Sequence, residues 1–139
     1  LSREQRLARA ERLLAASEIL ALLAPDALLR AGDQLRSWVE ATWPGATWHR
    51  EVPVTGSIAT SEGARRVLGA IDLLVMTTDG AVIIDHKSFP GAPAQWMEKA
   101  REFAPQMGAY AHLLRAAGVK VIGQWVHFTV GAGVVKLES

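Results

Sequence analysis

The 139-residue chain contains no cysteine, which excludes disulfide bonds, thiolate metal sites and cysteine nucleophiles. It has no uninterrupted run of about 18 apolar residues, so we expect no membrane-spanning helix. Its formal net charge is only +1, far from the strongly basic balance of a free-standing nucleic-acid-binding domain. Any affinity for DNA must therefore come from a local patch, from a metal ion or from another part of a larger protein.

An initiator methionine is also absent, and the charged first residues have no signal-peptide core. We therefore expect a fragment of a longer chain that forms one domain. Residues 1–24 would be a helical lead-in and residues 25–139 the core. Half of the residues are hydrophobic, which is enough to bury a substantial core.

The hydrophobic pattern predicts an α/β fold with a mixed sheet, in which helix, three strands, helix and strand follow one another before an extra C-terminal strand. We expect helices over residues 2–23, 25–42, 94–103 and 105–117. We expect strands over residues 48–54, 67–77, 81–87, 120–130 and 134–137. Small polar residues over 55–66 predict a loop or the tip of a long hairpin. Because strands flanking a crossover helix tend to be parallel, a helix should cover at least one face.

Two apolar strands joined by a hairpin turn at residues 78–80 carry charges that a plain core strand would not need. Strand side chains alternate between faces, so Asp85 and Lys87 share one face and His86 points to the other. Asp72 joins them from the neighbouring strand if the hairpin register allows it. Two carboxylates and a lysine can hold a hard cation beside a phosphate. The alternative is a structural ion pair of Lys87 with Asp85 or Asp72, which would add little stability.

Three segments carry a family resemblance: Gly-Ala-Ile-Asp-Leu-Leu at 69–74, Ile-Asp-His-Lys-Ser at 84–88 and Phe-Ala-Pro-Gln-Met-Gly-Ala-Tyr at 103–110. Together they resemble the nuclease motifs of the PD-(D/E)XK superfamily. The nearest branch is the RecB-like nuclease domain at the C-terminus of AddA- and UvrD-type helicases. The pattern of that branch is G-x-I-D, then I-D-Y/H-K-T/S, then Y/F-x-x-Q-L/M-x-x-Y. The resemblance covers residues 26–138 and implies a restriction-endonuclease-like core.

The resemblance implies that Asp72 and Asp85 ligate Mg²⁺ or Mn²⁺, with the backbone carbonyl of His86 as a further ligand. Lys87 would orient the attacking water and stabilise charge on the phosphate, and Gln106 would support the site. Further candidates for substrate contact are Tyr110, Arg36, Arg65, Arg66 and Trp96. Tyr110 fits a core role equally well, and the two adjacent arginines fit a solvated turn equally well.

The first helix departs from the family pattern. The family often has a histidine ligand four residues after a glycine on this helix, but here Gly32 is followed at that spacing by Arg36, which cannot ligate a cation. Glu40 or Glu51 could complete the site instead. The site could also work with two carboxylates, or with reduced or no activity.

The resemblance as a whole implies a metal-dependent DNA exonuclease that hydrolyses phosphodiester bonds. Such a domain would act on single strands delivered by a helicase during DNA repair and recombination, at the nucleoid in the bacterial cytoplasm. The alternative is a catalytically inactive nuclease-fold module that binds DNA or packs against a helicase. The near-neutral charge and Arg36 favour this second interpretation.

Overall fold

The computed structural model describes residues 2–8, 25–130 and 133–137. Residues 3–8 are helical. They begin with the capping box that the Ser2–Gln5 spacing predicts: the Ser2 amide donates to Gln5 Oε1 at 2.8 Å and the Gln5 amide to Ser2 Oγ at 3.1 Å. The rest of the first predicted helix, residues 9–23, lies outside the described residues. No helix of the described ranges is long and apolar enough to cross a membrane.

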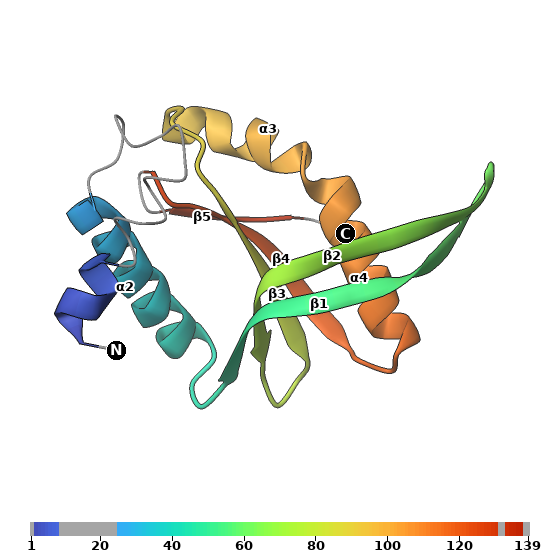
Figure 1. The fold of residues 1–139 in the computed structure, drawn as a ribbon, viewed down its shortest axis with the longest axis horizontal. Helices are drawn as coiled ribbons and strands as arrows, with labels where there is room; N and C mark the ends of the chain where they lie inside the picture. Colours follow the sequence, from blue (N-terminus) through green and yellow to red (C-terminus); the bar gives the residue numbers. More distant parts are fainter. Residues whose placement is uncertain (1, 9–24, 131–132, 138–139) are drawn as a thin grey trace.

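A five-stranded mixed sheet forms the centre of the molecule, in the order β1-β2-β3-β4-β5 (Figure 1). The elements are α2 (Pro25–Thr42), β1 (Thr47–Thr60), β2 (Gly63–Met76), β3 (Ala81–Lys87), η1 (Pro93–Gln95), α3 (Trp96–Arg101), α4 (Ala104–Ala116), β4 (Val121–Phe128) and β5 (Gly133–Lys136). Strands β3 and β4 are parallel and joined through α3 and α4, and the other neighbours are antiparallel. The predicted fold class and order of elements are confirmed.

The two faces of the sheet are covered by different helices, which we call the α2 face and the α4 face. On the α2 face the buried cluster consists of Leu35, Val39, Leu73, Val75, Val82 and Ile84. On the α4 face the larger buried cluster includes Leu74, Ile83, Met107, Tyr110, Ala111, Val126 and Phe128. The alternation predicted for residues 81–87 is therefore confirmed, since neighbouring residues of β3 enter opposite clusters.

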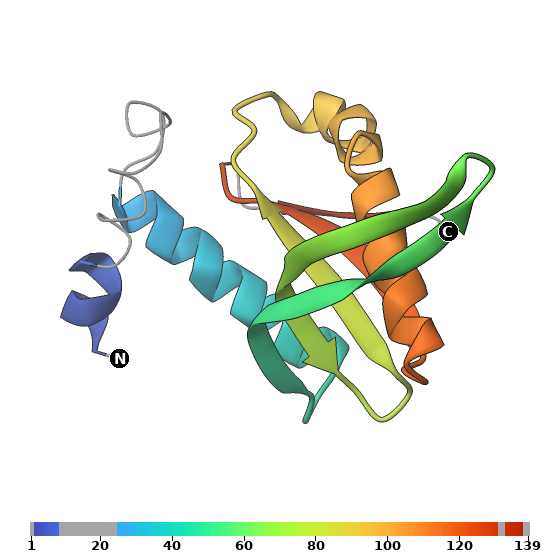
Figure 2. The ribbon, with the colours of Figure 1, turned by 45° about the vertical axis from the view of Figure 1, so that its right-hand side comes forward.

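Strands β1 and β2 extend far beyond their predicted lengths. Of the two alternatives predicted for residues 55–66, the tip of a long hairpin is confirmed and the loop is wrong, because both strands continue to a turn at residues 61–62. The outer half of this ribbon crosses α4 (Figures 1 and 2), where Val54 and Val67 are buried in the α4-face cluster. A Cβ at Gly56 would lie 2.6 Å from Leu113, so a small residue there allows the close approach to the helix. The small residues that suggested a loop in this segment instead allow it to pack against α4.

The ribbon changes direction where β2 leaves β3. Glu51 has a left-handed backbone conformation, with φ of 52°, which is rare for a residue other than glycine. Its position on β1 lies opposite Asp72, between the register pairs Arg50↔Leu73 and Val52↔Ile71. The β2–β3 ladder ends at the adjacent pair, which joins Leu73 to Ile84. Beyond this pair the two strands separate, and the charged residues of both lie at the separation.

Candidate metal centre

Asp72 and Asp85 face each other at the point where β2 and β3 separate. The last ladder pair is Leu73↔Ile84, so the next position in the same register brings Asp72 opposite Asp85. Asp85 lies on the α4 face by alternation along β3, and the Asp72 carboxyl is close enough to act on the pKa of Asp85. Alternation along β2 is broken here, since Ile71 and Leu74 both enter the α4-face cluster. The His86 backbone amide donates to Asp72 Oδ2 at 2.8 Å, which satisfies an amide that the ended ladder leaves free. The hairpin register therefore brings together the two carboxylates that the motifs single out.

Lys87 lies beside Asp85 on the same face. Its Nζ is 2.9 Å from Asp85 Oδ2 and 4.4 Å from the centre of the Phe103 ring. The negative face of the ring and the carboxylate both attract the ammonium, so its position is defined from two sides. The end of β4 holds the Lys87 backbone, because the Thr129 amide donates to the Lys87 carbonyl at 3.0 Å. Lys87 is thus positioned close to the carboxylates, with 29% of its side chain exposed.

The position of the Asp85 carboxyl disfavours its ionised form. Burial raises the pKa of Asp85 to about 6, and the neighbouring Asp72 carboxyl raises this pKa further, while Lys87 acts in the opposite direction. Asp85 Oδ2 is buried, and its close neighbours are the Lys87 ammonium at 2.9 Å and the Asp72 carboxyl. A buried carboxylate beside a second carboxyl is costly to ionise, and the ammonium offsets part of this cost. The carboxyl pair therefore favours a proton or a further cation.

These donors fit a hard divalent cation. Two carboxyls side by side, one of them buried with a raised pKa, provide the oxygen ligands that Mg²⁺ and Mn²⁺ take, and Mg²⁺ keeps several waters besides. Asp72 and Asp85 would hold the ion, which when bound polarises a phosphoryl oxygen and lowers the pKa of a bound water. Among the described residues no group of three or more histidine and acidic side chains could hold a metal, so the two carboxylates stand without a third such ligand.

A hydrogen-bonded pair from α4 lies next to the ribbon. Gln106 Nε2 donates to Tyr110 Oη at 3.1 Å, and Tyr110 is only 5% exposed. A Cβ at Gly69 would collide with the Tyr110 hydroxyl, so the glycine three residues before Asp72 allows β2 to pass directly over this ring. The spacings Gly69–Asp72 and Gln106–Tyr110 are therefore linked in space, because one tyrosine packs under one glycine while contacting the glutamine.

The residues considered for completing the metal site are dispersed. Arg36 and Glu40 are exposed on α2, the helix that covers the other face of the sheet. Glu51 is exposed at the bend of the ribbon. None of these side chains forms a three-ligand group with the carboxylate pair within the described part of the chain.

The candidates for substrate contact lie in different settings. Arg65 and Arg66 are exposed on the outer half of the ribbon, opposite Ile58 and Ser57. The Trp96 indole is half-buried, stacks on Phe128 with 5.3 Å between ring centres, and donates from Nε1 to the Gly91 carbonyl at 3.2 Å. The two arginines are thus accessible to a strand of nucleic acid, whereas one face of Trp96 is used in packing.

Sequence reasoning missed three neighbours of the site. Phe103 lies under Lys87, Thr129 bonds the Lys87 carbonyl, and His127 lies 2.9 Å from His86 between their Nδ1 atoms. Phe103 occurs in the third motif segment and could have been found there. His127 is on β4 and Thr129 directly follows this strand, whose register against β3 is set across a long crossover, so no spacing in the sequence indicates them.

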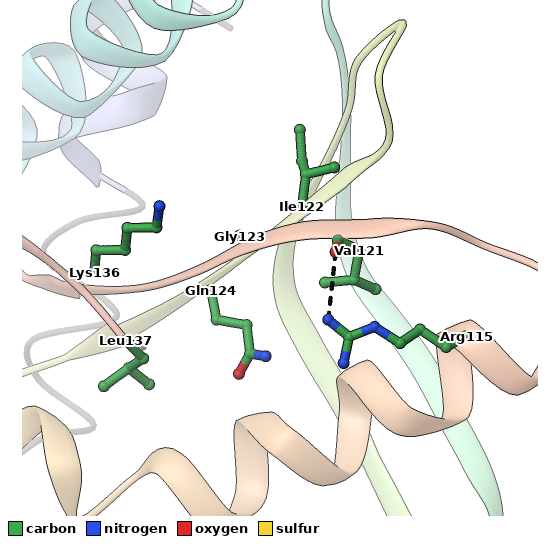
Figure 3. A pocket seen from close by; sticks show the side chains of 7 residues that line it. All are labelled: Arg115, Val121, Ile122, Gly123, Gln124, Lys136 and Leu137. Atoms are coloured by element: carbon green, nitrogen blue, oxygen red, sulfur yellow. Dashed lines mark hydrogen bonds between the residues drawn. The ribbon is translucent and has the colours of Figure 1, made fainter. Parts of the chain in front are cut away.

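A cavity of about 120 Å³ lies at the edge of β4, away from the carboxylates (Figure 3). It is lined by Arg115, Val121, Ile122, Gly123, Gln124, Lys136 and Leu137. Arg115 donates to the Val121 carbonyl at 3.3 Å, and Figure 3 shows Lys136 on the other side of the strand from Gln124. The last β4–β5 register pair is Trp125↔Lys136, so the cavity lies where the pairing of these two strands ends.

Two comparisons with known proteins find similar proteins, and a third finds none. No curated protein matches the chain. A solved structure described as "Crystal structure of SSO0001" is similar at 15% identity with a TM-score of 0.48, over 95% of this chain and 60% of that chain. The present chain therefore spans about 60% of the length of that structure. The family profile described as the PD-(D/E)XK nuclease superfamily matches residues 2–139. The chain belongs to the PD-(D/E)XK nuclease superfamily.

Proposed function

We propose that this chain is a divalent-metal-dependent deoxyribonuclease that hydrolyses phosphodiester bonds at the separation of β2 and β3. The observation that carries the proposal is the grouping of Asp72, Asp85 and Lys87 where the two strands separate, with Lys87 Nζ 2.9 Å from Asp85 Oδ2 and the His86 amide bonded to Asp72 Oδ2. Membership of the superfamily supports a nuclease. A metal held by two carboxylates, beside a lysine that can orient water and stabilise phosphate charge, is sufficient for this chemistry.

Each residue has a separate task in this proposal. Asp72 and Asp85 hold Mg²⁺ or Mn²⁺, with the His86 carbonyl as a further ligand. Lys87 meets the water and the phosphate, and its contact with Phe103 keeps it at the edge of the site. Gln106 supports the site from α4 through its bond to Tyr110. Substrate contacts extend to Tyr110, Arg36, Arg65, Arg66 and Trp96. Glu40 or Glu51 would complete the coordination of the ion if the chain moved to bring one of these side chains to the carboxylates.

The wider role proposed is that of an exonuclease acting on single-stranded DNA in repair and recombination. On this proposal residues 25–139 are the nuclease core of a larger helicase-nuclease that works at the nucleoid in the bacterial cytoplasm. The near-neutral net charge supports delivery of the strand by a partner domain, because the chain itself has little electrostatic attraction for DNA.

The test is cleavage of end-labelled single-stranded DNA by the whole chain with Mg²⁺, Mn²⁺ or EDTA. The decisive variant is Asp85→Asn, which keeps the shape of the side chain and removes its charge. Asp79→Asn is a matched control, because Asp79 is exposed in the β2–β3 turn. We expect metal-dependent cleavage by the wild type and by the control, and none by Asp85→Asn. Absence of metal-dependent cleavage, or equal cleavage by Asp85→Asn, would contradict an active nuclease.

A second candidate is an inactive nuclease fold that binds DNA or packs against a helicase. It is favoured by Arg36 on α2 and by the absence of a third acidic or histidine ligand beside the carboxylates within the described residues. Calorimetric titration with Mn²⁺ separates the two candidates. Stoichiometric binding that is lost in Asp72→Ala, together with cleavage, excludes the inactive module, whereas no binding favours it.

A further inference from the structure

We propose that His127 is a positioning residue of the candidate metal centre and acts through His86 from the opposite face of the sheet. The proposal rests on the proposed function, because it concerns the backbone between the same carboxylate and lysine. It starts from the contact between His86 and His127, whose side chains are not among the acids and the lysine assigned to the site.

His86 and His127 are register partners in the parallel β3–β4 pair. Their Nδ1 atoms are 2.9 Å apart, and their rings are nearly perpendicular, with 5.0 Å between the ring centres. His127 is 3% exposed and His86 is half-buried. The distance is that of a hydrogen bond, which requires one Nδ1 to carry a proton and the other to present a lone pair.

The contact between the two rings restrains the orientation of the His86 ring. A bond over 2.9 Å forms only where the Nδ1–H of one ring points at the Nδ1 lone pair of the other. Because the rings are nearly perpendicular, a rotation of either ring moves its Nδ1 out of this line. The bond therefore defines the orientation of the His86 ring.

The His86 peptide in turn links the two sides of the site. Its amide donates to Asp72 Oδ2 at 2.8 Å, just beyond the last β2–β3 ladder pair. Asp85 and Lys87 flank it, so a rotation of the His86 backbone turns both of their side chains. Groups that orient metal ligands from outside the ligand shell typically matter about 10- to 100-fold for metal affinity. His127 is placed to exert such an effect, because it restrains the side chain of His86, which lies on the α2 face between Asp85 and Lys87 in the chain.

Two substitutions of His127 separate positioning from plain packing. Asn places an amide atom about as far from the backbone as Nδ1, so His127→Asn can keep a bond to His86. His127→Leu fills the space and cannot bond. Val39→Ala serves as the matched control for lost stability, since Val39 is fully buried in the α2-face cluster and belongs to a different element.

The experiment uses the whole chain and two readouts. The first is the Kd for Mn²⁺ by calorimetry at neutral pH. The second is the nuclear magnetic resonance signal of the His86 backbone amide in EDTA, which reports its bond to Asp72 without metal. We expect His127→Leu to weaken Mn²⁺ binding about tenfold or more and to shift the His86 amide upfield. His127→Asn should remain close to wild type in both readouts, and Val39→Ala should lower the melting temperature and change neither.

Equal effects of His127→Leu and His127→Asn, or a wild-type His86 amide in His127→Leu, would overturn the positioning role. If His127→Leu does not fold, the wild type decides: no scalar coupling between the two Nδ1 nuclei means no bond, and the inference fails. If the wild type binds no Mn²⁺, the proposed metal centre fails by itself. The amide signal of the metal-free variants still tests the link from His127 to Asp72, so the two failures are distinguishable.

Discussion

The two faces of strand β3 satisfy their polar groups in different ways. On the α4 face, Lys87 Nζ lies 2.9 Å from Asp85 Oδ2, and burial beside Asp72 raises the pKa of Asp85 to about 6. On the α2 face, the Nδ1 atoms of His86 and His127 lie 2.9 Å apart. Two carboxyls held together favour a bound cation, whereas a bonded pair of rings adds order. The proposed function therefore uses the α4 face for chemistry and the α2 face for support.

The strongest test of this comparison removes the cation from the α4 face. We expect Lys87→Met to slow metal-dependent DNA cleavage about 1,000-fold, because the water and the phosphate lose their positioned charge. Mn²⁺ binding at mildly alkaline pH should be retained or strengthened, since the ammonium no longer competes for Asp85 Oδ2. Cleavage assays and calorimetry measure the two effects.

Lys99→Met is the control for this test. Lys99 pairs with Glu102 at 2.8 Å on α3 and does not contact either carboxylate in the contacts described. The control should behave as wild type in both assays. If Lys87→Met cleaves DNA at the wild-type rate, the α4 face does not carry out the cleavage chemistry.

A large effect of a different kind is expected on the α2 face. Trp125 contacts Trp38 and Trp43 edge to face, with ring centres 4.8 Å and 6.5 Å away. Trp125→Ala should lower the free energy of unfolding by about 3 kcal/mol through lost burial and a residual cavity. Denaturant unfolding measures this loss. Mn²⁺ affinity of the folded variant should be unchanged, and a large drop would show that the two faces are not separable.

The raised pKa of Asp85 predicts a third effect, which depends on pH. In the metal-free folded chain this pKa is about 6, above the unfolded value of 3.8, so the folded state holds the proton more tightly. The resulting stabilisation is complete below about pH 3.8 and is lost as pH rises through about 6. Relative to Asp85→Asn, wild type in EDTA should therefore lose up to about 3 kcal/mol between these limits.

Denaturant titrations of both proteins across this range measure the difference. The same proton competes with metal, so Mn²⁺ binding should weaken as pH falls below about 6. Parallel pH profiles of stability for wild type and Asp85→Asn would contradict the raised pKa, and with it the cost of ionising Asp85 in its buried position.

The smallest effect is expected at the tip of the ribbon. Arg65→Gln and Arg66→Gln should each weaken DNA binding only a few-fold and reduce the slope of affinity against salt concentration by about one. Arg101→Gln provides a control, because Arg101 is exposed on α3. Binding titrations at several salt concentrations measure the slope. An unchanged slope would leave these arginines as solvated residues and would confine DNA contact to the sheet.

Much of the site could be predicted because it depends on short-range patterns. The turn at residues 78–80 sets the β2–β3 register, and this register places Asp72 opposite Asp85. Alternation along β3 separates Asp85 and Lys87 from His86. The roles of these residues stay predictions, since the structure establishes their placement and not their activity.

The packing of the ribbon and the second histidine could not be predicted for the opposite reason. The composition of residues 55–66 left both a loop and a long hairpin open, and only the structure shows that Gly56 and Gly69 are small where Leu113 and Tyr110 of α4 lie against them. The pairing of His86 with His127 depends on the register of β3 and β4, whose partners are 41 residues apart in the chain. Neither the packing of these glycines against α4 nor the histidine pair produces a periodic pattern in the sequence.

The sequence by itself determined which residues share a face and where the central hairpin turns, because side-chain alternation and turn conformation are local properties of the backbone. Only the tertiary structure decided that β2 leaves β3 at Asp72, that Asp85 is buried there beside Asp72 and Lys87, and that His127 contacts His86 from β4. These features arise from packing the ribbon over α4 and from closing the crossover between β3 and β4, which involve contacts between distant parts of the chain.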